Sequence, residues 1–213
     1  MEMVVDKKVQ SSLERYATAE IPTQGGSLRV VVFRDHRKES THTSSEHVAL
    51  IVGDISEELN NVMVRVHSEC ITSEVFGSMK CDCRDQFDAA LQKMRDHGCG
   101  VLVYLRQEGR GIGLGNKIRA YELQAKGFDT VDANHQLGFA TDLRNYNIAG
   151  EILNDLGVTG VSILTNNPDK VEGLASAGID INDRLACEVP SNDHSEQYLA
   201  TKRNRCGHIL ELI

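Results

Sequence analysis

The chain has 213 residues, a formal net charge of −8 and 25% charged residues. This length suits a single domain that can bury a sizeable core. The acidic balance argues against a general nucleic-acid-binding surface, because such a surface needs clustered lysine and arginine. A local basic pocket for one anionic ligand remains compatible with that balance.

Neither a membrane span nor a secretion signal is expected. The sequence holds no apolar run of about 18 residues, and its first residues lack the apolar core of a signal peptide. We therefore expect a cytoplasmic protein that does not bind a membrane. Cytoplasmic thiols stay reduced, which favours metal binding or burial over disulfides for the cysteines.

The first part of the chain predicts a lead-in followed by strands. Residues 1–20 are polar and charged and predict a helical or loose lead-in, with one domain over residues 21–213. Runs rich in β-branched residues predict strands over residues 28–33, 47–52 and 62–67. The charged segment 34–46 predicts a surface loop or hairpin.

The second part alternates between helix and strand patterns. Apolar residues from Phe87 to Met94 follow helical spacing, and Gly98 predicts the end of that helix. The glycines of segment 109–115 predict a flexible loop. Further elements are predicted as strands over residues 100–105 and 161–164, and as helices over residues 116–127, 148–156 and 171–177. This alternation predicts an α/β fold, with a layered mixed sheet, packed helices and some parallel pairing.

Cys70, Cys81 and Cys83 form a Cys-x10-Cys-x-Cys array. Three thiolates bind zinc but leave one tetrahedral position open, as a catalytic zinc requires. His67 is the nearest candidate to close the site, and buried thiols or a redox pair are alternatives. Three further cysteines stand alone in the sequence and are interpreted as bystanders: Cys99, Cys187 and Cys206.

The cysteines lie within a longer set of motifs, which includes RVHSEC from Arg65, KCDC from Lys80 and EGRGIG from Glu108. These motifs resemble GTP cyclohydrolase II, the zinc enzyme that opens the guanine ring of GTP in riboflavin biosynthesis. The likeness continues at DANHQLGF (132–139), DLR (142–144), LTNNPDK (164–170) and QYLATK (197–202), and IPT (21–23) is similar to the family's first strand.

The resemblance implies a set of functional residues. One zinc ion per chain would be held by Cys70, Cys81 and Cys83. The implied GTP contacts are Arg65, Val66, His67, Ser68, Glu69, Gln86, Glu108, Gly109, Arg110, Thr130, Thr165 and Lys170. The implied catalytic residues are Asp142 as proton acceptor, Arg144 as nucleophile, and Tyr121.

The chemistry of these side chains leaves several alternatives open. Arginine is effectively always protonated, so Arg144 is a poor nucleophile and suits electrostatic stabilisation of phosphate better. Either Glu69 or Glu108 could accept hydrogen bonds from the guanine edge. Tyr121 could orient water or protonate a ring nitrogen, or pack in the core.

Three charged residues near the motifs have competing interpretations. Lys117 and Arg119 could reach phosphates or be solvated helix charges. Asp82, between two of the cysteines, is interpreted as a solvated turn residue.

The chain departs from the family pattern at a few positions. Arg84 stands where the family usually has glycine, which requires a backbone that avoids positive φ. Lys80 replaces the usual arginine, Gly115 replaces a large apolar residue, and segment 185–193 diverges. These departures leave room for a paralogue with altered product.

The expected reaction converts GTP to formate, pyrophosphate and a diaminopyrimidinone ribosyl phosphate, with Mg²⁺ bound to the triphosphate and a homodimer as in the family. Two alternatives remain: a same-fold enzyme that retains the formyl group, and a non-catalytic nucleotide-binding regulator. Many family members are fused to a dihydroxybutanone phosphate synthase, and this sequence matches the cyclohydrolase half.

Overall fold

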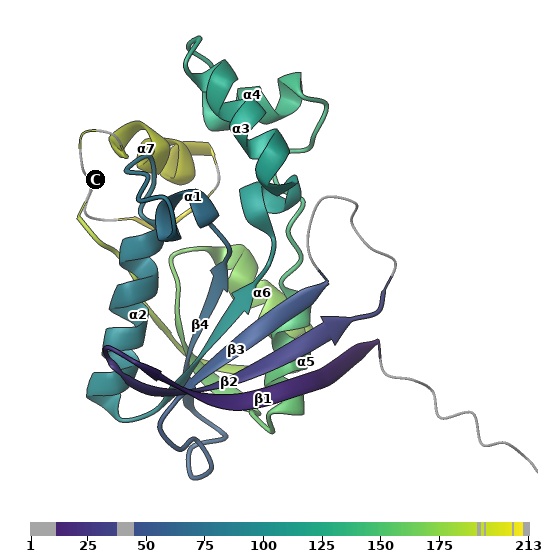
Figure 1. The fold of residues 1–213 in the computed structure, drawn as a ribbon, viewed down its shortest axis with the longest axis vertical. Helices are drawn as coiled ribbons and strands as arrows, with labels where there is room; N and C mark the ends of the chain where they lie inside the picture. Colours follow the sequence, from purple (N-terminus) through teal and green to yellow (C-terminus); the bar gives the residue numbers. More distant parts are fainter. Residues whose placement is uncertain (1–11, 38–44, 191–192, 194, 206, 211–213) are drawn as a thin grey trace, which may run out of the picture.

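The structure, a computed structural model, describes residues 12–37, 45–190, 193, 195–205 and 207–210. Among these residues, seven strands form one mixed sheet with the order β1-β2-β3-β5-β4-β6-β7 (Figure 1). The strands are β1 (Leu13–Thr23), β2 (Gly26–Asp35), β3 (Glu46–Val52), β4 (Val62–Ser68), β5 (Gly100–Leu105), β6 (Gly160–Leu164) and β7 (Asp180–Leu185). The predicted α/β fold with a layered mixed sheet is confirmed.

The sheet has an antiparallel half and a parallel half. Strands β1, β2, β3 and β5 pair antiparallel in that order. Strand β4 then pairs parallel with both β5 and β6, and β6 pairs parallel with β7. The carboxyl ends of β4, β5 and β6 therefore meet at one edge, where α/β proteins commonly bind ligands.

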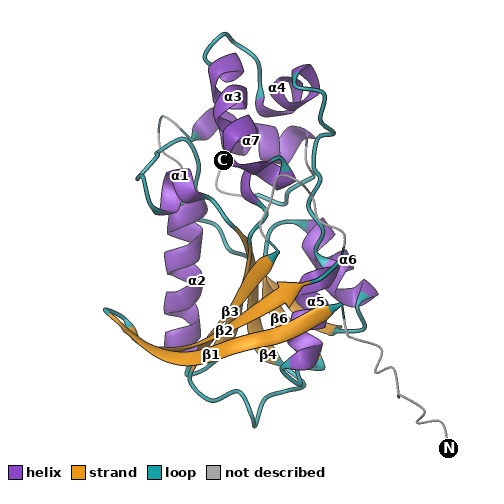
Figure 2. Cartoon of the chain, turned by 45° about the vertical axis from the view of Figure 1, so that its right-hand side comes forward, coloured by secondary structure: helices purple, strands orange, loops and turns teal. Residues whose placement is uncertain are grey.

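Helices cover both faces of the sheet and its carboxyl edge. The helices are α1 (Ile71–Glu74), α2 (Cys83–His97), the 3-10 helix η1 (Glu108–Gly111), α3 (Gly113–Gln124), α4 (Thr130–Gln136), α5 (Asn147–Asp155), α6 (Pro168–Ser176) and α7 (Glu196–Arg205). Helix α2 lies on one face and α5 and α6 on the other, whereas α1, α3, α4 and α7 gather beyond the strand ends (Figure 2).

Two apolar cores hold these layers together. Helix α2 packs Ala90, Leu91 and Met94 against one face of the sheet. Helices α5 and α6 pack against the other face, through residues such as Ile152 and Leu174. The central strands are buried on both faces, which is why their sequences are nearly continuous apolar runs.

The lead-in prediction is wrong for residues 13–20, which belong to β1. This strand pairs with β2 from Leu13 to Thr23, with a register shift between Arg15 and Ala17. Its side chains are exposed along almost the whole strand, so the sequence lacks the apolar signal of a buried strand. Residues 1–11 lie outside the described part.

The glycine-rich segment differs from the predicted flexible loop. It forms the 3-10 turn η1, and α3 begins at Gly113, three residues earlier than expected from Asn116. Gly109, Gly111 and Gly113 have positive φ, so glycine allows this tight path. The segment 34–46 does connect an antiparallel pair, but its residues 38–44 are not described. None of the described helices has the length and apolar character of a membrane span.

Candidate functional site

The three predicted zinc ligands come together at the carboxyl end of β4. Cys70 precedes α1, and Cys81 and Cys83 lie at the start of α2. Their sulfur atoms all lie within 4.8 Å of one another, and the Cys70 and Cys81 sulfurs are 3.6 Å apart. Zinc–sulfur bonds of about 2.3 Å in a tetrahedron place two sulfurs about 3.8 Å apart. The array therefore fits one zinc ion.

The thiols alone cannot all ionise. Hydrogen bonds from Cys81 and Cys83 lower the pKa of Cys70, and the Lys117 ammonium adds to this effect. The pKa of Cys83 is raised, because its two thiol neighbours and its burial disfavour a further negative charge. A divalent cation would remove this conflict by stabilising all three thiolates.

His67 does not close the cysteine array. Its Nε2 atom lies 2.7 Å from the Glu74 carboxylate, which also accepts a 2.5 Å hydrogen bond from the Tyr104 hydroxyl. Burial lowers the pKa of His67 to about 4, so the ring is neutral at pH 7. Among the described residues, the metal-ligand cluster at this place consists of the three cysteines, which leaves a fourth position for water or substrate.

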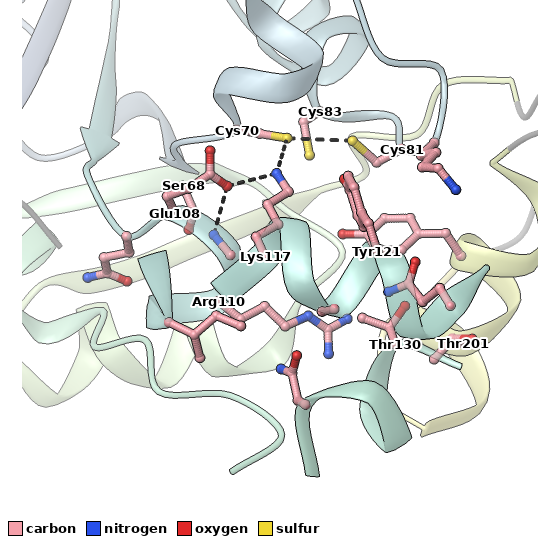
Figure 3. A pocket seen from close by; sticks show the side chains of 18 of the residues that line it. Ser68, Cys70, Cys81, Cys83, Glu108, Arg110, Lys117, Tyr121, Thr130 and Thr201 are labelled. Atoms are coloured by element: carbon pink, nitrogen blue, oxygen red, sulfur yellow. Dashed lines mark hydrogen bonds and ion pairs between the residues drawn. The ribbon is translucent and has the colours of Figure 1, made fainter. Parts of the chain in front are cut away.

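The cysteines line a cavity of about 180 Å³, called here the outer cavity. Glu108, Lys117 and Tyr121 face the cysteines across this cavity (Figure 3). A smaller inner cavity of about 60 Å³ adjoins it and is lined by Arg65, His67, Gln86, Thr165, Lys170 and Lys202, among others. The following residues line both cavities: Ser68, Cys83, Arg110, Arg144 and Tyr198.

Lys117 connects the thiols to Glu108. Its Nζ atom lies 3.1 Å from the Cys70 sulfur and 2.7 Å from Oε1 of Glu108 (Figure 3). The same carboxylate accepts 2.7 Å hydrogen bonds from the backbone N–H groups of Ile71 and Gly109. Lys117 is thus a mostly buried charge beside the thiols rather than a solvated helix residue, whereas Arg119 bonds Asn116 in an exposed position.

Tyr121 points into the outer cavity from α3. Its hydroxyl lies 3.5 Å from the Thr72 hydroxyl, and its ring stands 5.7 Å from the Lys117 ammonium. Burial raises the pKa of Tyr121, so the phenol stays protonated and can act as a hydrogen-bond or proton donor. The alternative of a core position for Tyr121 does not hold, since it lines the cavity.

The interpretation of Asp82 as a solvated turn residue is wrong, because its side chain is buried. Its carboxylate lies 2.5 Å from the Lys202 ammonium and accepts a 2.6 Å hydrogen bond from Gln86. Gln86 in turn accepts a 2.5 Å bond from Arg65. This chain of polar contacts joins α7, α2 and β4 beneath the inner cavity.

The inner cavity is a concentration of positive charge with unused donors. Among the described residues, Nε of Arg65 and Nδ2 of Asn167 are buried and have no hydrogen-bond partner. Burial, with the charges of Arg65 and Arg144, lowers the pKa of Lys170 well below its usual value. Lys170 donates a 2.9 Å bond to the backbone carbonyl of Val66. A bound anion would favour the charged form of Lys170.

Asp142 and Arg144 form a two-pronged ion pair at the junction of the cavities. Nε and Nη2 of Arg144 lie 2.9 Å and 2.5 Å from the two oxygens of Asp142, and Nη1 lies 3.5 Å from the Ser68 hydroxyl. Burial opposes ionisation, yet Arg144 holds the pKa of Asp142 below its ordinary value. Tyr146 and Asp142 raise the pKa of Arg144 despite its burial.

Nearly all the predicted site residues gather around the two cavities. Thr130 and Glu69 line the outer cavity and Thr165 lines the inner one. Val66 lies in the core, and its carbonyl accepts a hydrogen bond from Lys170. Asp142 lines neither cavity but pairs with Arg144. Residues not assigned a role from the sequence also line the cavities: Asn167, Tyr198, Thr201 and Lys202. Asn167 lies in the LTNNPDK motif and the other three lie in QYLATK. Their place in these motifs was the feature of the sequence that could have identified them.

The chain is similar to known proteins over most of its length. The family model for GTP cyclohydrolase II matches residues 14–186. The chain belongs to the GTP cyclohydrolase II family. This assignment applies to the matched residues, because similar proteins are considerably longer than this chain.

Curated relatives are similar over most of the chain but are longer. The riboflavin biosynthesis protein RibBA of Bacillus subtilis (strain 168) is 48% identical over 93% of this chain and 48% of its own length. The Synechocystis RibBA is 46% identical over 93% of this chain and 35% of its own length. The chain therefore spans half or less of these relatives.

A solved structure gives a much weaker likeness. The two-domain 3,4-dihydroxy-2-butanone 4-phosphate synthase RibBX from A. baumannii aligns with a TM-score of 0.41 and 19% identity, over 83% of this chain and 42% of that one.

The departures from the GTP cyclohydrolase II pattern are accommodated. Among the described residues, Arg110 is the non-glycine residue with positive φ, so Arg84 imposes no strain of that kind. Arg84 bonds Asp88 and the Glu74 carbonyl in an exposed position. Lys80 lines the outer cavity, and a Cβ at Gly115 would meet open space.

Proposed function

We propose that this chain hydrolyses GTP, opens the guanine imidazole ring at C8, and releases formate, pyrophosphate and a diaminopyrimidinone ribosyl phosphate. This reaction would be the first step of riboflavin biosynthesis, in line with the names of its relatives. The observation that carries the proposal is the junction of a three-thiol array and a basic cavity. The thiol array suits zinc, and the basic inner cavity suits phosphates. Five residues line both the outer and the inner cavity.

The cysteines would hold one zinc ion at the outer cavity. Zinc held there would supply Lewis acidity and lower the pKa of water toward neutrality. Two other residues of the outer cavity would assist. Tyr121 would donate a hydrogen bond or a proton to the opening guanine ring, and Lys117 would balance the negative charge of Cys70.

Guanine recognition is assigned to the carboxylates beside the thiols, with Glu69 favoured. Glu108 already accepts three hydrogen bonds from protein donors. Glu69 has an ion pair with Arg106 at 3.4 Å and keeps more acceptor capacity for the N1–H and amino group of the purine.

The inner cavity would bind phosphate groups. Arg65, Lys170 and Arg144 offer donors of fixed position, and Mg²⁺ would accompany the triphosphate. Arg144 is assigned an electrostatic role. The Asp142 carboxylate has a lowered pKa and is a weak base, and the Arg144 guanidinium has a raised pKa and is a weak nucleophile.

A homodimer is also proposed. Strand β1 is an edge strand of 11 residues with exposed side chains that include Tyr16 and Ile21. Such an edge is usually covered by another chain or protected by charge. Light scattering during gel filtration would give the mass of the assembly, and a monomer at micromolar concentration would contradict this part.

The dependence on zinc tests the proposal. We expect removal of zinc with a chelator to abolish GTP consumption and zinc addition to restore it. Cys81→Ser should lose this recovery, because a serine oxygen is a poorer zinc ligand than a thiolate. GTP consumption that continues at the full rate in metal-free protein would contradict the proposed role of the cysteines.

A further inference from the structure

A second group of metal-binding side chains lies at the other end of the sheet. Glu58 precedes β4 and Cys99 precedes β5, whereas the cysteines of the outer cavity and Glu108 follow these strands. His97 is the last residue of α2. The three potential ligand atoms of these residues lie within 4.8 Å of one another.

The distances within this group match a metal site. Nε2 of His97 lies 3.2 Å from Oε2 of Glu58, and the Cys99 sulfur lies 3.4 Å from the same oxygen. Tetrahedral zinc with bonds of about 2.0 to 2.3 Å places its ligand atoms about 3.4 to 3.6 Å apart. The two distances to the Glu58 oxygen are therefore close to those of a zinc site, and the His97 nitrogen and Cys99 sulfur lie within 4.8 Å of each other.

The backbone holds the three residues in place. Gly98 ends α2 with a φ of 104°, and this turn separates His97 from Cys99. Gly53 packs so closely on the Gly98 carbonyl that an added Cβ would lie 2.1 Å from its oxygen. This contact brings the loop that carries Glu58 against the end of the helix.

Neighbouring contacts fix the loop itself. The N–H of Glu58 donates to the carbonyl of Ile55, and the N–H of Asn61 donates to the carbonyl of Glu58. Ile55 is buried in the apolar core, and Leu59 packs against that core. The carboxylate is thus presented from an anchored turn, which reduces the ordering needed to bind an ion.

From this arrangement we propose that Glu58, His97 and Cys99 form a second site for a divalent zinc-like cation, remote from the proposed catalytic centre. A sulfur, nitrogen and oxygen donor set favours zinc, whereas magnesium and calcium favour oxygen ligands alone. Binding replaces the Cys99 thiol proton, which passes to solvent. Water would complete the coordination, and the partly exposed side chains of Glu58 and His97 leave a path for the ion.

Metal content distinguishes the two sites. The protein is equilibrated with zinc, passed through a desalting column, and analysed for zinc per chain. We expect two zinc ions in the wild type and one each in Cys81→Ser, Cys99→Ser and His97→Gln. The double variant with Cys81→Ser and Cys99→Ser should hold none. Activity toward GTP should be unchanged in His97→Gln.

Two control variants test whether zinc binds to any similar group. His36 lies 2.8 Å from Glu14 without a nearby cysteine in the described chain, and Cys187 is a buried thiol outside both groups. His36→Gln and Cys187→Ser should each keep two zinc ions.

Thermal unfolding gives a second readout. Added zinc should raise the melting temperature of Cys81→Ser, because the ion binds the folded state, but not that of the double variant. The proposal is overturned if Cys81→Ser holds no zinc, or if Cys99→Ser and His97→Gln keep the wild-type content. Because these results do not involve GTP, they separate this site from the proposed activity.

Discussion

The chemistry of individual residues in the site depends on contacts between distant parts of the chain. Lys117 and Cys70 are 47 positions apart, yet their side chains lie 3.1 Å from each other. Asp82 and Lys202 are 120 positions apart and form a buried ion pair. The sequence motifs indicated which residues belong to the site. They did not show that Lys117 lies beside the Cys70 sulfur or that Asp82 is buried, because neither contact has a local signal.

Arg144→Lys tests how the phosphates are handled. Lysine keeps the charge but loses the planar group that holds both oxygens of Asp142. If Arg144 stabilises charge, pyrophosphate release should survive at a rate lower by about 10²-fold, as for other lost electrostatic donors. Steady-state rates of pyrophosphate release would measure this.

The zinc content of Arg144→Lys should equal that of the wild type, which serves as the control for folding of the site. Complete loss of turnover with full zinc content would instead favour a covalent role for Arg144. An unchanged rate would exclude both roles.

At the scale of elements, α7 completes the site from the far end of the chain. Lys202 joins it to Asp82 at the start of α2, and Arg205 pairs with Asp129 and Asp132 at α4. The helix also brings Tyr198 and Thr201 to the outer cavity. Its sequence is mostly polar, so apolar periodicity gave no signal for it.

Lys202→Met should destabilise the fold because it leaves the Asp82 carboxylate buried without its cation. Loss of one partner of a buried pair costs about 3–5 kcal/mol. Adding Asp82→Asn should recover part of this loss, since an amide carries no charge. Urea unfolding of the wild type, both single variants and the double variant gives the coupling energy. Additive single effects would contradict a direct interaction.

His47 on β3 makes the stability depend on pH. Burial lowers the pKa of His47 to about 4, and its Nδ1 accepts a hydrogen bond from the N–H of Arg106. The unfolded chain, with a histidine pKa near 6.5, binds more protons than the folded chain between these values. The free energy of unfolding should therefore fall as the pH drops from about 6.5 to about 4.

One such histidine changes the free energy of unfolding by at most about 1.4 kcal/mol per pH unit. The pKa of His67 is also lowered by burial, so His67 contributes in the same direction. His47→Asn keeps an acceptor near the Nδ1 position but does not titrate. Urea unfolding at several pH values should show a shallower slope for this variant. If the free energy of unfolding varied with pH equally in the variant and the wild type, the pKa of His47 would not be lowered in the folded protein.

At the scale of the whole molecule, the sheet brings the motifs together. The parallel strands β4, β5 and β6 end at one edge, where each is followed by a motif that lines the cavities. Apolar runs predicted these central strands closely, because burial on both faces leaves a clear signal. The exposed edge strands β1 and β7 have polar, exposed sequences. Their residue pattern predicted neither, and only residues 21–23 of β1 were expected as strand, from the family resemblance.

The most direct test of the account follows the C8 atom of the substrate. Zinc-loaded protein is incubated with Mg²⁺ and GTP labelled with carbon-13 at C8, and the products are separated and analysed by mass spectrometry. We expect the label in free formate, with pyrophosphate and an unlabelled diaminopyrimidinone ribosyl phosphate formed in equal amounts. Label retained in a formylated nucleotide product, or GTP recovered intact, would contradict the proposed reaction.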